Sequence, residues 1–406
     1  MVRIEKQRFA GISAGFTLAL LASTGAQAQT LEELRTRVSA LEAQQAETGR
    51  VIVPAGTTLE FGGYAKLDFT YDLDQGQGDT TNTGGLGFGA LNGGGFNAHA
   101  RQSRFFFKTT TDTANGPLKT HFEFDFFGGG GNQILSNSFQ PRLRHAYGTW
   151  NGILAGQTWT NFMPIDFYPN TLDFQGPSGI PFIRQAQLRY TFPVGDAFTI
   201  STSLENSEFS GRNAAGRLGQ TSGNGVNADL DKLPDFTLAA AWKGDRAAFR
   251  ASAVVRDLNT PGDTDSATGW GLNLAGSADL WQGGKIIASA TYGDGIGRYL
   301  IDGAGQDGYV NAAGQLQTIS AAGFTTQITH DFNDTLTAGL TYGYYKVNDT
   351  FAATDTEKLQ TVHASVFWKP AKKVMIGGEL IWGERQLAGG QSVNANRVQT
   401  SVQFNF

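Results

Sequence analysis

The sequence has no cysteine and no apolar stretch long enough to cross a membrane as a helix. Without cysteine, the chain can hold neither disulfide bridges nor the lipid that bacterial lipoproteins carry on that residue. Beyond residue 28, no segment approaches the ~20 apolar residues of a membrane helix. The mean hydropathy of -0.25 suits a soluble protein, but it is also typical of a membrane barrel with a polar lining. A disulfide-stapled domain and a helical membrane protein are therefore excluded.

Proline is also scarce, and the chain is mildly acidic. Only 11 residues are proline, whereas glycine and phenylalanine reach 54 and 29 and are spread evenly beyond residue 60. This even composition favours one long β array over the two or three soluble domains that ~375 residues would normally form. The formal net charge is -5, so we expect no nucleic acid partner.

Residues 1–28 have the pattern of a secretory signal peptide. A basic start with Arg3, Lys6 and Arg8 precedes the apolar run GISAGFTLALLA, and an Ala-Gln-Ala site ends at Ala28. The apolar run is too short to span a bilayer as a helix. We therefore expect the chain to leave the cytoplasm and to be cut after Ala28.

Residues 29–50 have a helical pattern. Leu31, Leu34, Val38 and Leu41 are spaced by three, four and three residues, which makes an a/d seam of about two and a half heptads. Isolated helices of this length are marginal in water. We favour a periplasmic coiled coil that holds several chains together; the alternative is a lone amphipathic helix at the barrel rim. Pro54 breaks the helix, so residues 51–60 are expected to be a linker.

From residue 61 to 406 the polarity alternates with the period of a β-strand. Between residues 64 and 73, for example, Leu67, Phe69 and Tyr71 are apolar while Asp68 and Thr70 are polar. The pattern predicts sixteen strands, near residues 61–73, 98–111, 117–127, 139–150, 152–160, 182–192, 197–206, 234–243, 246–258, 267–281, 284–294, 316–331, 335–347, 357–369, 373–387 and 394–406.

The connections between these strands alternate between long and short without exception. A long loop at 74–97 is followed by the tight DTANG turn, then a loop at 128–138, then an Asn-Gly turn. An even-numbered, antiparallel, up-and-down outer-membrane barrel requires this alternation. A soluble sandwich, the alternative, has no reason to gather every long loop at one end. Aromatic residues near the short turns suit an interfacial girdle; they are Phe192, Trp242, Trp281 and Trp368.

The last segment, RVQTSVQFNF, has one wholly polar parity and one apolar parity. In a barrel its polar face would line the lumen, its apolar face would contact lipid, and the strand would pair with residues 61–73 to close the ring. Arg397 then becomes a lumen charge. The predicted fold is an all-β, transmembrane 16-stranded antiparallel barrel preceded by a short α-helical coiled-coil segment.

Several segments also resemble DcaP-like outer-membrane porins, across essentially the whole mature chain. They are FGGYAKLDFTYD, RQSRFFFKTTT, RLRHAYG, LAGQTWTNF, GIGRYL and the terminal RVQTSVQFNF. The resemblance implies a homotrimeric porin in a Gram-negative outer membrane, with its N-terminal coiled coil in the periplasm and a preference for small anions such as dicarboxylates. Similarity to other outer-membrane barrels implies that the assembly machinery recognises Phe406.

A sixteen-stranded barrel leaves an aqueous lumen, and its narrowest point decides selectivity. The proline-rich loop 161–181, which carries Asp166 and Asp173, is the candidate constriction; the alternative is a merely external loop. Basic residues are expected along the inner wall and near this loop: Arg104, Lys119, Arg142, Arg144, Arg184, Arg189, Arg298, Arg385 and Arg397. Such a wall would attract carboxylates, although each arginine could instead pair with neighbouring acids. For Arg142, Arg144, Arg184 and Arg189 we favour a solute role.

No pattern predicts catalysis, a cofactor or a metal. The five histidines are scattered without ligand spacing, and Asp72, Asp74 and Asp79 fit a solvated loop better than a divalent site beside lipopolysaccharide. The predicted function is passive diffusion through an outer-membrane channel that prefers small organic anions. A general or sugar-type porin is the first alternative, and a barrel hydrolase or adhesin is the second.

Overall fold

The computed structural model describes residues 32, 35–37, 39–40, 50–53, 56–89, 93–218, 232–303 and 305–406. It divides into two units, residues 1–48 and residues 49–406. In the first unit, the described residues have helical backbone, and the Thr36 hydroxyl donates to the Glu32 carbonyl at 2.8 Å. The expected signal peptide and the four seam leucine and valine residues of the expected coiled coil lie outside the described residues. Among the described residues, no helix is both long and apolar enough to span a membrane.

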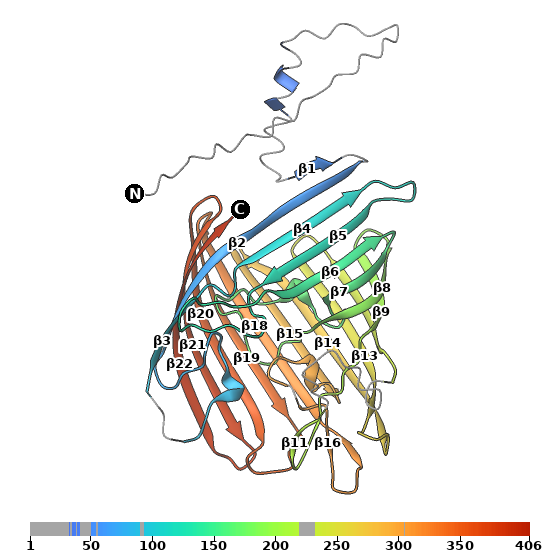
Figure 1. Cartoon of the computed structure of the whole chain (residues 1–406), viewed down its shortest axis with the longest axis vertical. Helices are drawn as coiled ribbons and strands as arrows, with labels where there is room; N and C mark the ends of the chain where they lie inside the picture. Colours follow the sequence, from blue (N-terminus) through green and yellow to red (C-terminus); the bar gives the residue numbers. More distant parts are fainter. Residues whose placement is uncertain are drawn as a thin grey trace, which may run out of the picture. The chain divides into compact units, whose positions relative to one another are not determined.

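The second unit is a closed ring of antiparallel strands (Figure 1). The strands of the ring are β2 (Thr57–Asp72), β3 (Gly95–His99), β4 (Arg104–Thr111), β5 (Leu118–Asp125), β6 (Arg142–Trp150), β7 (Ile153–Trp159), β8 (Arg184–Val194), β9 (Phe198–Glu205), β12 (Asp235–Lys243), β13 (Ala247–Asn259), β14 (Ser266–Trp281), β15 (Gly284–Asp294), β18 (Ser320–Asn333), β19 (Leu336–Val347), β20 (Thr356–Ala371), β21 (Val374–Leu387) and β22 (Ser392–Asn405). Because β3 and β4 both pair with β2, they occupy one position, and the predicted sixteen-stranded antiparallel barrel is confirmed.

The last strand closes the ring on the first, as the alternating pattern predicted. Strand β22 pairs with β2 from Arg397 opposite Asp72 to Asn405 opposite Tyr64. Beyond this ladder, the Phe406 amide donates to the Gly63 carbonyl at 3.1 Å, and the rings of Phe406 and Phe61 lie 5.5 Å apart. Within the described ring, therefore, neither β2 nor β22 is a free edge.

The two faces of each strand have the polarity of a membrane barrel. On β22, the side chain of Phe404 faces outward with 55 % of its surface exposed, whereas Gln399 and Ser401 face inward and are buried. On β21, Leu380 is likewise 61 % exposed while the inward Glu379 is buried. Apolar residues outside and polar residues inside are the reverse of a soluble protein, so the wall is suited to lipid outside and water inside.

Two expected segments differ in the structure. Residues 51–60, expected to be a linker, include part of β1 (Arg50–Val53) and the start of β2, which pair with each other. The strand expected at 98–111 is broken at residues 100–103. At the break, the Ser103 hydroxyl accepts from the Lys66 amide at 2.9 Å and donates to the Lys66 carbonyl at 3.2 Å, replacing the lost ladder bonds. The use of a serine side chain in place of backbone hydrogen bonds could not be predicted from polarity alone.

The long loops carry structure of their own. Three single-turn 3-10 helices lie in them: η1 (Thr83–Gly85), η2 (Ile165–Phe167) and η3 (Gly297–Tyr299). A separate four-stranded sheet consists of β10 (Arg212–Asn213), β11 (Gly216–Arg217), β16 (Gly308–Val310) and β17 (Leu316–Thr318). The whole of β17 lies within the strand expected at 316–331, so the barrel strand begins only at Ser320.

The loops also fill one side of the barrel interior. Phe162, from the loop between β7 and β8, packs with Ile296 and Tyr299, from the loop between β15 and β18. This cluster is buried against inward residues of the wall, including Val254 on β13 and Tyr345 on β19. Packed side chains therefore occupy the interior beside these parts of β13, β18, β19 and β20.

A glycine in the wall makes room for the loop between β7 and β8. A Cβ added to Gly343 on β19 would lie 2.6 Å from the Pro177 Cβ and 2.7 Å from the Ser178 backbone. On β21, by contrast, a Cβ added to Gly378 would meet no atom within 4 Å. The loop therefore lies directly against the inner wall at Gly343.

We expect Gly343→Val to reduce the free energy of unfolding by about 1–3 kcal/mol, because it overpacks the contact with the loop. The matched control, Gly378→Val, should change it by no more than about 0.5 kcal/mol, as surface substitutions do. Urea unfolding in detergent micelles, together with protease cleavage of residues 161–181, measures both effects. Equal stability and cleavage of the two variants would contradict the packing.

Candidate functional site

The loop between β7 and β8 crosses the barrel interior. Near its start, the Asn161 amide donates to Glu205 Oε1 on β9 at 2.8 Å. Further along, the Asn170 amide donates to Gln327 Oε1 on β18 at 3.0 Å. The Ser178 amide then donates to the Thr361 hydroxyl on β20 at 3.0 Å. The loop thus leaves β7, reaches the far wall and returns to β8, which is the inward course expected for residues 161–181.

Two buried charges of opposite sign hold the tip of this loop. Glu379 Oε2 accepts from the Leu172 amide at 2.6 Å, and Lys66 Nζ donates to the Leu172 carbonyl at 2.8 Å. Glu379 is supported by His363 Nδ1 at 2.9 Å, and Lys66 forms an ion pair with Asp68 at 3.0 Å. Because both backbone groups of Leu172 are bonded to the wall, the position of the tip is tightly determined.

The two acidic residues of the loop have different surroundings. Asp173 is 3 % exposed, and its carboxylate accepts from the amides of Thr81 and Gly176 at 2.8 and 3.0 Å. Burial raises the pKa of this carboxyl above its usual value. Asp166, in η2, is exposed. Asp173 therefore organises the loop, whereas Asp166 remains accessible to solvent.

A cavity of 310 Å³ lies between the loop and the wall formed by β4 to β7. The wall contributes Arg104, Glu123 and Arg144, and the loop contributes Tyr168 and Phe174, among other residues. The arginine-bearing wall is opposite the interior side that the loops fill. The cavity is thus the place where the predicted basic wall meets the predicted constriction loop.

Carboxylates on β5 bind two of the arginines at this wall. Arg144 donates from Nε to Glu123 Oε1 at 2.6 Å and from Nη1 to Asp125 Oδ2 at 2.9 Å. Arg142 donates from Nη2 to the same Asp125 oxygen at 2.7 Å. Arg104 lies 3.7 Å from Glu123 Oε1, at the long end of an ion pair. Arg142 and Arg144 thus stabilise the wall, while Arg104 is only loosely paired.

A β-bulge aims Arg144 into the interior. On β5, Glu123 pairs with His145 and Phe124 pairs with Leu143, so Arg144 is the extra residue of β6. Both Arg144 and His145 are buried, which a regular strand with alternating faces would not allow. Bulges commonly redirect side chains in this way beside functional sites.

Arg184 has no acidic partner among the described residues. Its guanidinium lies 4.5 Å from the centre of the Trp159 ring, and Nη1 is buried without a hydrogen-bond partner in the described structure. Arg104 and Arg144 line the cavity, while Arg142 and Arg184 stack on Phe174 and Trp159, which line it. The carboxylates there are Glu123, Asp125 and Asp173, so the guanidinium groups outnumber them by four to three. The cavity therefore has an excess of positive charge and donor groups that the wall does not use.

The other predicted site residues lie elsewhere. Arg189 donates to Gln187 Oε1 and to the Trp159 carbonyl, so it supports the start of the loop. Lys119 is exposed at the short-turn end of β5. Arg385 donates to the Leu86 carbonyl at 2.7 Å in another long loop. Of the four arginines favoured for a solute role, the structure brings Arg142, Arg144 and Arg184 together. Arg104 joins them at the cavity, and Arg189 does not.

Two further predicted arginines are engaged in ion pairs. Arg397 faces inward, but its side chain is fully covered and donates to both carboxylate oxygens of Asp72 at 2.7 and 2.9 Å. Arg298 lies 3.3 Å from Asp235 Oδ2 and donates to Gln185 Oε1 at 2.7 Å. Both arginines therefore contribute to the packing of the loops rather than to the cavity.

Sequence reasoning missed the aromatic residues of the site. Phe174 lies beneath Arg104, Arg142 and Arg144, with ring-to-guanidinium distances of 5.4 to 5.8 Å. Trp159 lies beneath Arg184. Such stacking holds a guanidinium in place while leaving its edge donors free. The one sequence feature that could have indicated Trp159 and Phe174 is their position between Arg144 and Arg184.

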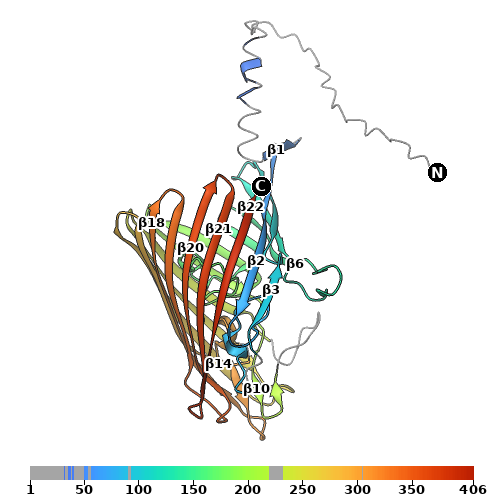
Figure 2. The ribbon, with the colours of Figure 1, turned by 90° about the vertical axis from the view of Figure 1, so that its left-hand side faces the viewer.

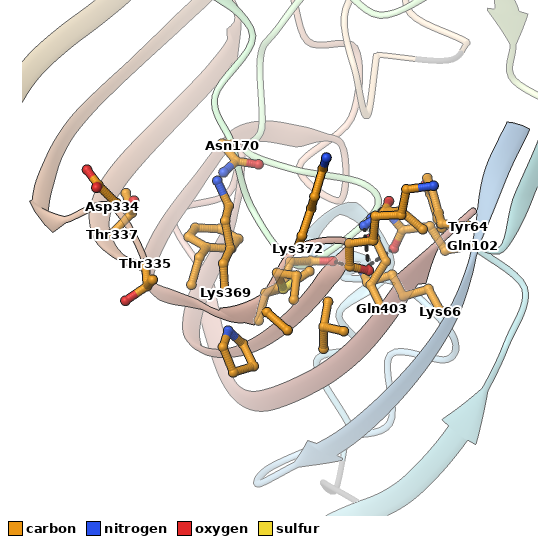
Figure 3. Close-up of a pocket in the computed structure, with 18 of the residues that line it drawn as sticks. Tyr64, Lys66, Gln102, Asn170, Asp334, Thr335, Thr337, Lys369, Lys372 and Gln403 are labelled. Atoms are coloured by element: carbon orange, nitrogen blue, oxygen red, sulfur yellow. Dashed lines mark hydrogen bonds between the residues drawn. The ribbon is translucent and has the colours of Figure 1, made fainter. Parts of the chain in front are cut away.

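A second, larger cavity opens at the short-turn end of the barrel (Figure 3). Its volume is 740 Å³, and its lining includes the turn 369–373 and the loop residues Asn170 to Leu172. Four residues line both cavities: Gln102, Arg104, Asn170 and Thr171. The arginine cavity is therefore adjacent to this mouth.

Metal binding has no support in the described part of the chain. No group of three or more histidine, aspartate or glutamate side chains gathers there with a geometry that could hold an ion. Asp79 is bonded to Arg101 and Asn97. Burial raises the pKa of Asp79, but these hydrogen bonds outweigh that effect and lower it overall. Asp72, as described above, is bound by Arg397.

A protein-family model described as DcaP outer membrane protein matches residues 26–406. The chain belongs to the DcaP outer membrane protein family. The resemblance noted in the sequence is thereby confirmed. Among curated proteins, no sequence matches this DcaP-family chain.

Several solved structures share the fold of this DcaP-family chain. The outer membrane channel DcaP of Acinetobacter baumannii has a TM-score of 0.76 and 22 % identity, over 88 % of this chain and 99 % of that one. An anion-selective porin from Comamonas acidovorans has a TM-score of 0.55 and 13 % identity, over 86 % and 100 %. OmpT, an outer membrane protein of Vibrio cholerae described in a trimer form, has a TM-score of 0.54 and 13 % identity, over 86 % and 100 %. The family is one of outer membrane proteins, and these structures share the barrel fold of this chain.

The loop contacts include one carboxyl whose protonation should alter stability. Asp302, between β15 and β18, accepts from the Ser178 hydroxyl at 3.0 Å, and burial raises its pKa to about 6. Since the folded state binds the proton more tightly than the unfolded chain, the stabilising contribution is complete below about pH 4 and is lost as the pH rises through 6.

We expect Asp302→Asn to remove this pH dependence, because asparagine cannot ionise. Relative to the variant, the wild type should lose on the order of 2 kcal/mol of unfolding free energy between pH 4 and pH 8. Urea unfolding in micelles at both pH values measures the difference. Parallel pH profiles for the two proteins would show that Asp302 is not responsible.

Proposed function

We propose that this chain is a passive outer-membrane diffusion channel that prefers small organic anions, such as dicarboxylates. The observation that supports this proposal most directly is the excess of guanidinium over carboxylate around the cavity beneath the loop. A solute moves down its own gradient, so no covalent chemistry and no cofactor are required. Selectivity follows from the charge and size of the narrow region.

Arg104 and Arg184 are the residues proposed to meet the solute. Arg104 is only loosely paired, and Arg184 has no acidic partner among the described residues. A guanidinium presents forked donors that match a carboxylate, and it is more weakly hydrated than an ammonium group. Arg104 lines the cavity, and Arg184 stacks on Trp159, which also lines it. Two such groups beside one cavity suit a solute with two carboxylates, and the positive field raises the local concentration of anions.

The size of the cavity favours a small solute. Its 310 Å³ lies at the lower end of the range of small-molecule sites. The loop tip is fixed by Lys66 and Glu379, so the cavity has a defined width rather than one that adapts to each solute. In this proposal, loop 161–181 is the constriction, and Asp166 is a solvent-exposed acid at its edge.

We expect Arg104→Gln combined with Arg184→Gln to lower the anion-to-cation permeability ratio by about tenfold, the smaller end of the enrichment that a charged cleft produces. The reversal potential of planar bilayers under a potassium chloride gradient measures the ratio. Glutamine at these positions leaves Asp125 and Glu123 bound by Arg142 and Arg144, so the wall should remain folded.

The matched control is Arg246→Gln combined with Lys285→Gln, which removes the same charge from exposed short turns. This control should keep the wild-type ratio. A cation-selective wild type would overturn the anion proposal and favour a general or sugar-type porin. A protein with no conductance would instead favour the hydrolase or adhesin.

We also propose that the chain forms homotrimers through the loop between β5 and β6. Figure 2 shows this loop, beside the β6 label, projecting from the barrel wall. Ile134 and Leu135 in this loop are 85 % and 93 % exposed in the single chain. Adjacent exposed apolar side chains on a loop are unfavourable in water and commonly mark a contact with a partner. The trimer form of the Vibrio cholerae protein supports the same assembly by analogy.

We expect Ile134→Asp combined with Leu135→Asp to weaken the trimer, because each subunit would then place charge in an apolar contact. Semi-native gels run at increasing temperature should show the variant dissociating before the wild type. Replacement of the exposed, polar Asn132 and Gln133 by serine is the control and should leave the transition unchanged. A wild type that is monomeric in mild detergent would disprove the proposal.

The remaining partners follow from the orientation that we propose. The outward apolar face contacts outer-membrane lipid, and the long-loop end lies at the cell surface beside lipopolysaccharide. The short-turn end and residues 29–50, proposed as a coiled coil, then lie in the periplasm. Phe406, which closes the ring against Gly63 at that end, is the residue proposed to be recognised by the assembly machinery.

A further inference from the structure

Three lysines lie on one short turn at the mouth shown in Figure 3. Lys369, Lys372 and Lys373 line the 740 Å³ cavity on and beside the connection of β20 with β21. In this view, Lys369 and Lys372 lie between the Asp334–Thr337 segment on one side and Tyr64, Lys66 and Gln102 on the other. The lysines therefore stand at the opening, not on the lipid-facing wall.

The ammonium groups of these lysines are not neutralised by ion pairs in the described structure. All three are exposed, and none forms an ion pair within the described residues. The acid on the lining of this cavity is Asp334, in the neighbouring turn. Lys66 also lines the cavity, but it is bonded to Asp68 and to the loop tip. The mouth consequently presents a local excess of mobile positive charge.

The mouth is continuous with the arginine cavity. Arg104 and Gln102 from the wall, together with Asn170 and Thr171 from the loop, line both spaces. An anion that leaves Arg104 toward the short-turn end therefore enters the field of the lysine turn. The other short turns have a different charge balance, since four of them carry an acid: Asp112, Asp196, Asp245 and Asp334.

We propose that Lys369, Lys372 and Lys373 form a second anion-binding station, which receives small carboxylates from the arginine cavity at the short-turn mouth. This inference rests on the proposed function and adds a second site to it. Lysine ammonium groups are strongly hydrated point charges on flexible stems, whereas arginine forks hold a carboxylate in a fixed orientation. The first station thus selects the anion, and the second binds it loosely enough to release it.

Two adjacent anion sites of unequal affinity allow an anion to be bound selectively and still be released. A single tight site retains its solute, whereas neighbouring sites allow one ion to displace the next. The lysine turn should matter most at low ionic strength, because screening lengths shorten from about 30 Å at 0.01 M to about 3 Å at 1 M. Its effect should also depend on the direction of flow, since it lies at one end only.

The test uses Lys369→Gln, Lys372→Gln and Lys373→Gln together, with potassium malonate as the probe in planar bilayers. We expect the malonate conductance at low concentration to fall by about threefold, the current to rectify differently from wild type, and both effects to vanish near 1 M salt. The matched control removes three charges from other short turns, with Lys243→Gln, Arg246→Gln and Lys285→Gln, and should behave as wild type.

A second variant separates charge from side-chain chemistry. Replacing the three lysines with arginine keeps the positive charge, so it should preserve both the conductance at low concentration and the rectification of the wild type. A loss as large as that of the glutamine variant would contradict a role of the charge. If the glutamine variant and the control conduct alike at every concentration, the second station is disproved while the anion selectivity of the arginine cavity stands. If wild type is not anion-selective, the proposed function fails, and this inference fails with it.

Discussion

The tip of one loop, held by two charges inside the barrel, determines the rest of the interior. Leu172 is bonded through its amide to Glu379 and through its carbonyl to Lys66. Inside a protein such charge-assisted hydrogen bonds are strong, but each charge is costly to bury unless its own partners are in place. His363, Ser365 and Asp68 supply those partners. If the tip were released, the wall of the arginine cavity opposite β4–β7 would be lost.

This arrangement divides the interior into two halves with different physical roles. Beside β13 and β18–β20, apolar loop residues such as Phe162 and Tyr299 form a core of the kind found in soluble proteins. Beside β4–β7, arginines and carboxylates line open space, and aromatic rings fix the guanidinium groups. The packed half holds the loops against the wall, and ion pairs and ring contacts hold the long side chains of the open half in place.

Much of this architecture could be predicted from the sequence, because a membrane barrel imposes a period of two and alternating connections on the whole chain. Each of the sixteen ring positions overlaps an expected strand, and Arg104, Arg142 and Arg144 were expected to face inward. The bulge at Arg144, the hydrogen bonds of the Ser103 hydroxyl with the Lys66 backbone, and the hydrogen bonds that hold Leu172 were not predictable, since each depends on residues far apart in sequence. Arg397 illustrates the limit: parity predicts its direction, but only the fold shows that Asp72 binds it.

That Arg397–Asp72 pair has a consequence for how the ring closes. It joins residues at opposite ends of the barrel sequence, across the seam between β22 and β2. If the two strands paired one residue out of step, Arg397, Gln399 and Ser401 would all turn toward lipid, and a charged side chain in lipid is strongly unfavourable. The buried ion pair thus favours one register: only the correctly aligned seam lets the final strand bury its arginine, so a misaligned ring is less stable.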